Sequence, residues 1–149
     1  TAALIGELAD GRIGWAIRAG KDPALIETRE RAVQQLLELL AASRLTRLLF
    51  SQELAGRWSS DRAGVIAELD WWTSTLRDLA VCSVGTAGRR DQSARLAQLR
   101  DLAGSATPSS VIEAARSTQR TARLLEQNVN PRLALDTLVL DLPVFSNGR

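Results

Sequence analysis

The amino-acid sequence predicts an all-α fold, a compact bundle of about six to eight helices. Apolar residues recur at intervals of three and four in almost every segment, which is the spacing of one face of an α-helix. Three times a residue suited to cap a helix is followed directly by proline, a pair that marks a helix start: Asp22-Pro23, Thr107-Pro108 and Asn130-Pro131. No stretch alternates between apolar and polar residues in the manner of a strand. The length of 149 residues suits a single core.

The expected helices follow one another along the whole chain. They span about residues 2–9, 13–19, 23–42, 44–57, 61–84, 91–103, 108–127 and 131–142. The clearest apolar stripe lies in the segment 61–84 and consists of Val65, Leu69, Trp72, Leu76 and Leu79. Trp71 points about 100° away from Trp72 on a helix, so we expect it at the edge of the core or exposed. In the segment 44–57, one face is shared by Leu45, Leu48 and Leu49, and Phe50 and Leu54 lie on another.

Polar residues mark the ends of several expected helices. Ser43 and Ser60 are the expected caps of the segments 44–57 and 61–84. Asn128 is expected in the left-handed conformation that closes a helix, directly before the cap at Asn130. Val129 is expected to pack back on Ala134 as a hydrophobic staple. Two helices joined by so short a connection must be near neighbours.

The composition excludes several kinds of active site. The sequence has no histidine, no tyrosine and a single cysteine, so it can assemble neither a nucleophile–histidine pair nor a structural zinc site. No phosphate-binding glycine motif is present. The acidic residues lie mainly near arginines on polar helix faces, as Glu27 does with Arg31. We therefore expect no catalytic residue, cofactor, metal or small-molecule ligand.

Charge and hydropathy narrow the expected partners. The net charge of +2 comes from 19 basic and 17 acidic residues that are interspersed, so we expect no direct contact with nucleic acid. No uninterrupted apolar run is long enough to span a membrane, and a cytoplasmic location is the simplest expectation. The chain begins at Thr1 and holds no methionine, which favours a piece of a longer protein.

The segment 131–142 is apolar nearly all round. Its apolar residues include Leu133, Leu135, Leu138, Val139, Leu140 and Leu142. A helix of this kind must be buried on more than one side. It is either the central helix of the core, which is the more common case, or it is divided between the core and a partner protein.

Three stretches carry a family resemblance. The stretch 128–138 fits the pattern N-x-N-x-x-L-x-L-acid-x-L through Asn128, Asn130, Leu133, Leu135, Asp136 and Leu138. Trp71-Trp72 is followed by Leu76-Arg77-Asp78-Leu79. The stretch 8–16 reads Leu-Ala-Asp-Gly-Arg-Ile-Gly-Trp-Ala. In order, these resemble the final motif, the tryptophan-and-Arg-Asp helix and the AAA+ lid end of the delta-prime subunit of the bacterial DNA polymerase III clamp loader.

The resemblance implies a domain organisation and a set of partners. Residues 1–20 would be the last helices of the AAA+ lid, 21–143 the C-terminal helical collar domain, and 144–149 a loose tail. Collar domains of five subunits pack into a ring, so the implied partners are the gamma/tau and delta subunits. DNA and the sliding clamp would be reached only through the whole complex. Such lids often carry an arginine three positions after a glycine. Counted from Gly11, that position in this chain is Gly14, which implies that this lid makes no contact with nucleotide.

The residues expected to form or support a subunit interface are Trp71, Arg77, Asp78, Asn128, Asn130, Leu133, Leu135, Asp136 and Leu138. Two other classes of helical domain compete with the delta-prime collar. One is the similar collar of a gamma/tau ATPase subunit, from which only the two-asparagine motif separates it. The other is a regulator or adaptor domain, which would need convergent polar groups inside the bundle. A carboxylate-dependent enzyme would need two acidic residues on an apolar face, and Asp70 has no acidic companion there.

Overall fold

The computed structural model describes residues 20, 22–83, 101 and 107–145. These residues form five α-helices and no strand, which confirms the all-α prediction. The helices are α3 (Pro23–Leu40), α4 (Arg44–Trp58), α5 (Arg62–Ser83), α7 (Pro108–Glu126) and α8 (Pro131–Asp141). The other expected helices, at 2–9, 13–19 and 91–103, lie almost wholly outside the described residues, as does the expected lid of residues 1–20. Five helices are thus seen where six to eight were expected for the whole chain.

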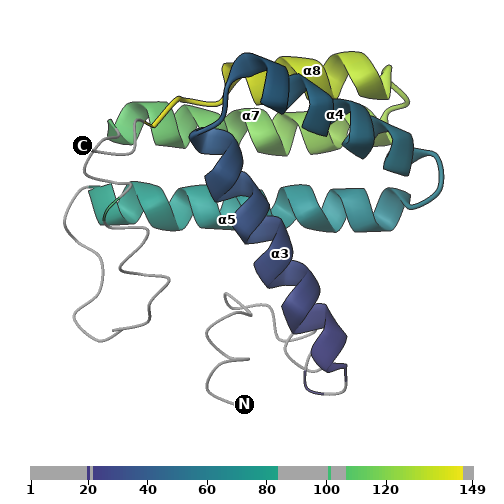
Figure 1. Ribbon diagram of the computed structural model, residues 1–149, viewed down its shortest axis with the longest axis horizontal. Coiled ribbons are helices and arrows are strands. Elements are labelled where there is room, and N and C mark those ends of the chain that lie inside the picture. Colours follow the sequence, from purple (N-terminus) through teal and green to yellow (C-terminus); the bar gives the residue numbers. More distant parts are fainter. Residues whose placement is uncertain (1–19, 21, 84–100, 102–106, 146–149) are drawn as a thin grey trace.

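The helices form two layers with α3 across one of them. α5 and α7 lie side by side and antiparallel, and α4 and α8 pair with each other along the far side of α7 (Figure 1). α3 crosses α5 at a steep angle. Because α7 contacts both α5 and α8, it joins the two helix pairs.

Three helix starts are capped as the sequence predicts. In each, a side-chain oxygen accepts a hydrogen bond from a backbone N–H two or three residues further on, at 3.0, 3.3 and 3.1 Å in Asp22, Ser43 and Asn130. Such caps satisfy N–H groups that the first turn of a helix leaves unpaired. They explain why α3, α4 and α8 begin where they do.

The cap of α5 is Asp61, and the prediction of Ser60 was wrong by one residue. Asp61 Oδ1 accepts a hydrogen bond from the N–H of Gly64 at 3.0 Å. A Cβ atom at position 64 would overlap the Asp61 carboxylate, so glycine leaves room for the capping group. At the start of α7, Thr107 lies at the expected cap position, but its side chain makes no capping bond.

The main core is built around the apolar stripe of α5. All five predicted members of that stripe have no exposed surface: Val65, Leu69, Trp72, Leu76 and Leu79. The indole N–H of Trp72 donates to the carbonyl oxygen of Ala32 at 2.9 Å, so this buried polar group is satisfied. The ring of Phe50 stacks on Trp72 with centroids 5.7 Å apart. α5 is therefore the central element of the described bundle.

A smaller core cluster lies between α3 and α5. Trp71 packs there against Ala32 and Val33 and is buried. Of the two positions expected for Trp71, the edge of the core and the exposed surface, the structure shows the first.

The core face of α4 differs from the apolar face that its leucines suggest. Leu45 and Leu49 are 68% and 58% exposed. The buried residues are instead Arg47, Ser51, Leu54 and Trp58, which recur at intervals of four, three and four. The polar members of this stripe are buried because each has hydrogen-bond partners on other helices.

Arg47 joins the ends of two helices to the final segment of the chain. Its guanidinium donates to five backbone carbonyls, those of Leu39, Leu40, Val139, Leu142 and Pro143, at 2.6 to 3.3 Å. Carbonyls at a helix C-terminus have no partner within the helix and carry partial negative charge. The cation thus satisfies the ends of α3 and α8 together, although burial lowers the pKa of Arg47.

The segment after α8 is anchored at a point where a loose tail was expected. Phe145 is 3% exposed, belongs to the main core, and donates its N–H to the carbonyl of Leu40 at 2.8 Å. Val144 is exposed. The expectation of a loose tail is therefore wrong at Phe145, and residues 146–149 lie outside the described part of the chain.

Candidate subunit interface

The turn between α7 and α8 folds as the two-asparagine motif predicts. Asn128 has a φ of 59° and so takes the left-handed conformation. The N–H groups of Asn128 and Val129 donate to the carbonyls of Leu125 and Leu124, both at 3.2 Å. This pair of bonds is a Schellman motif, which closes a helix end. With Asn130 capping α8 directly afterwards, four residues turn the chain back along α7.

Part of the motif lies in the core. Leu135 and Leu138 are buried, as is Ala134. Val129 is partly buried and packs against the same cluster as Ala134, as a hydrophobic staple requires. These residues hold α8 against α4 and α7, and Leu135 and Leu138 present no surface to a partner.

Asp136 ties α8 to α4. It accepts a short hydrogen bond from the hydroxyl of Ser51, and Arg132 donates to both of its carboxylate oxygens at 3.0 Å. Ser51 is buried and is one of the two polar residues in the core face of α4. The acidic position of the motif is thus a packing contact between helices.

The outer part of the motif is apolar and exposed. Leu133 is 65% exposed, and Leu140, two turns further along α8, is 41% exposed. Leu133 lines a groove of about 250 Å³ between α7 and α8 together with Leu124 and Val129, and polar side chains such as Arg120 and Asp141 lie at its rim. α8 is therefore divided between core and surface, and contact of its outer face with a partner protein stays a prediction.

The remaining candidates lie elsewhere in the fold. Arg77 is exposed and lines a separate groove between α5 and α7. Asp78 is half-buried on α5, and Trp71 is buried against α3. The structure thus unites Asn128, Asn130 and the α8 residues at one turn and helix, but it does not bring them together with the three candidates of α5.

A partly buried ion pair between α4 and α5 was not foreseen from the sequence. Arg57 donates to Glu68 at 2.9 Å, and the side chain of Glu68 is 9% exposed. Burial raises the pKa of Glu68, and the neighbouring Arg57 opposes that rise. Both residues line a groove of about 470 Å³ between α3, α4 and α5. The ion pair holds α4 and α5 together near their shared turn.

The described residues provide neither a metal-binding cluster nor a membrane-spanning helix. No group of three or more histidine, cysteine, aspartate or glutamate side chains is placed to hold a metal ion in that part of the chain. No helix among the same residues is both long and apolar enough to cross a membrane.

Comparison with known proteins returned no match: no protein family, no curated protein and no solved structure is similar to this chain.

Proposed function

We propose that this chain is a non-catalytic subunit-assembly domain, the collar domain of a delta-prime-like subunit of a bacterial clamp loader. The observation that carries the proposal is the division of α8 between core and surface. The motif that resembles the family holds Leu135 and Leu138 in the core and leaves Leu133 exposed beside Leu124. The family assignment itself rests on the resemblance of the sequence motifs.

Physical reasoning favours a protein partner for this surface. Full burial of a leucine side chain is worth roughly 1.5–3 kcal/mol, and Leu133 forgoes most of this in the isolated chain. The surrounding residues are held rigidly, because the turn before α8 is capped on both sides and Asp136 is bonded to Ser51. A rigid apolar surface loses little conformational entropy on binding. In the proposed role the chain supplies this surface to a neighbouring subunit and contributes no catalytic group.

The direct test is assembly with candidate partners. The chain, within its full-length protein, would be mixed with gamma/tau and delta subunits and examined by native mass spectrometry. The proposal expects one copy in a five-subunit assembly. Assembly only in place of a gamma/tau subunit would instead assign the chain to that related ATPase, and absence of any complex would contradict the proposal.

Leu133→Asp tests the proposed surface. We expect it to weaken assembly by at least ~10-fold, because a desolvated carboxylate would face the partner, while the melting temperature stays near that of the wild type. Leu45→Asp is the matched control, since Leu45 is 68% exposed on α4 and does not line the groove of Leu133. Leu135→Asp, at a buried position, is expected to prevent folding. Equal loss of assembly in the Leu45 and Leu133 variants would argue against this surface.

A further inference from the structure

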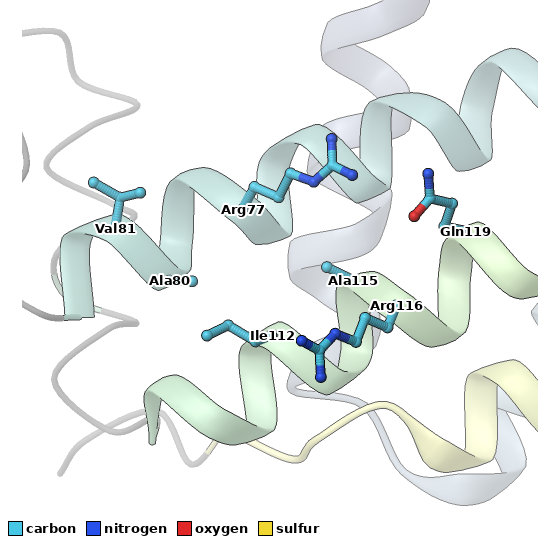
Figure 2. Close-up of a pocket in the computed structure, with 7 residues that line it drawn as sticks. All are labelled: Arg77, Ala80, Val81, Ile112, Ala115, Arg116 and Gln119. Carbon is cyan, nitrogen blue, oxygen red and sulfur yellow. The ribbon is translucent and has the colours of Figure 1, made fainter.

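A second groove lies between α5 and α7 and combines an apolar floor with cationic walls. Its volume is about 480 Å³, and its lining includes Ala80, Val81, Ile112 and Ala115. Figure 2 shows Arg77 on α5 and Arg116 on α7, on opposite walls of this groove, with the small alanine side chains between them. Trp71, which packs against α3, does not line this groove.

The two arginines of this groove are available to a partner. Neither Arg77 nor Arg116 forms an ion pair within the part of the chain that the structure describes. Val81 and Ile112 are 47% and 42% exposed, so a small ligand held here would remain largely in water. These features suit a protein segment that offers an apolar side chain next to a carboxylate.

The C-terminal end of α8 offers that combination. Leu140 is 41% exposed, Val144 is 71% exposed, and the exposed Asp141 lies between them in the sequence. Asp141 takes part in no ion pair among the described residues, whereas Asp136 is engaged by Arg132.

The other exposed leucine pair matches the groove less well. Leu45 and Leu49 lie on the outer face of α4, next to Arg44 and one turn before Glu53, which lines the α3–α4–α5 groove together with Arg57. This face thus carries both signs of charge, and its arginines would be repelled by Arg77 and Arg116. Charge complementarity therefore selects the end of α8 over the face of α4.

We propose that two copies of this chain associate head to tail, with the α8 end of one copy (Leu140, Asp141 and Val144) seated in the α5–α7 groove of the next. The two surfaces share no residue, so the contact is heterologous and each complex retains one free groove and one free α8 end. This association does not rest on the clamp-loader assignment, because it needs only the chain itself.

Sedimentation velocity over a wide range of protein concentration tests the association. We expect a concentration-dependent dimer and larger species, with weaker association as salt is raised. Arg77→Glu/Arg116→Glu is expected to weaken association by at least ~10-fold, since two attractions become repulsions. The matched control is Arg44→Glu/Arg123→Glu, which makes the same change of charge at exposed positions outside the groove. Circular dichroism establishes that each variant is folded.

Mixing two variants tests the head-to-tail geometry. Asp141→Arg alone is expected to be monomeric, as is Arg77→Glu/Arg116→Glu alone. Their mixture should form a dimer, because one variant keeps an intact groove and the other keeps an intact α8 end. A wild-type chain that stays monomeric at every concentration would overturn the proposal. So would equal weakening by the control pair, or a mixture that does not associate.

Discussion

The core faces of α4 and α5 are built on different principles. The stripe of α5 is apolar throughout, from Val65 to Leu79, and follows the spacing of a buried helix face. The stripe of α4 carries Arg47 and Ser51 beside Leu54 and Trp58. An apolar side chain is stabilised by any close-packed neighbour, whereas a buried polar side chain needs particular partners at particular positions. α5 therefore contributes most through burial of apolar surface. α4 contributes hydrogen bonds that determine which segments pack against it.

Arg47→Met is the strongest test of the difference between the polar core face of α4 and the apolar one of α5. It keeps an apolar stem of similar length but removes the guanidinium that donates to the five carbonyls at the ends of α3 and α8. We expect a loss of about 4 kcal/mol in the free energy of unfolding, because buried acceptors are left unpaired. Urea unfolding measures it, with the exposed Arg44→Met as control. Stability within about 1 kcal/mol of the wild type would show that the desolvation cost of the guanidinium cancels its hydrogen bonds.

Leu76→Ala gives the corresponding value for the apolar stripe of α5. Leu76 is fully buried, so the substitution removes its transfer free energy and leaves a cavity. We expect a loss of about 3 kcal/mol by the same unfolding measurement. A much larger loss than that of Arg47→Met would mean that the polar contacts of α4 are of minor importance to stability.

Ser51→Ala is expected to have a smaller effect. It removes the hydroxyl that donates to Asp136, but Arg132 remains bonded to both oxygens of that carboxylate. We expect a loss of about 1 kcal/mol. The double variant Ser51→Ala/Asp136→Ala should then cost less than the sum of the single changes, and strict additivity would contradict the contact.

Glu68 is a buried charged residue of α5 beside the apolar stripe, and it sharpens the comparison through the dependence of stability on pH. Its pKa in the folded chain is raised above the ordinary value of 4.5 because burial disfavours the charged form. The folded state therefore binds the proton more tightly than the unfolded state, so this group adds stability as pH falls through its folded pKa. Glu68→Gln should remove that part of the pH dependence, by well under about 1.4 kcal/mol per unit of pH. Unfolding curves from neutral pH down to the ordinary value of 4.5 measure it, and identical slopes in both proteins would contradict it.

The parts of this fold that the sequence predicts are those with local causes. The stripe of α5 follows from spacing, and the turn from Asn128 to Pro131 follows from residues suited to a left-handed closure and a cap. The faces of α4 could not be predicted in the same way. Leucines at 45 and 49 suggest one core face, and the structure buries another because the partners of Arg47 lie up to 96 residues away. The spacing of positions 47, 51, 54 and 58 is the signal that was available.

The candidate site shows the same limit. The motif around α8 could be named from sequence, but its leucines look alike, and only packing separates Leu133 from Leu135. Trp71 and Arg77 belong to one helix and one motif, yet one is buried against α3 and the other lines a groove on a different side. Which residue of an apolar helix faces solvent is decided by the position of its neighbours, and those neighbours are distant in the sequence.

The reach of Arg47 has a consequence during synthesis of the chain on the ribosome. Three of its acceptors, the carbonyls of Val139, Leu142 and Pro143, lie 92 to 96 residues downstream. At a translation rate of roughly 5–20 residues per second, they emerge roughly 5–20 s after the arginine itself. A nascent chain that has already folded α3 and α4 must keep this cation hydrated in the meantime. A product that ends before α8 would lack these acceptors, so an unfinished chain would keep in water a charged group that the complete chain buries.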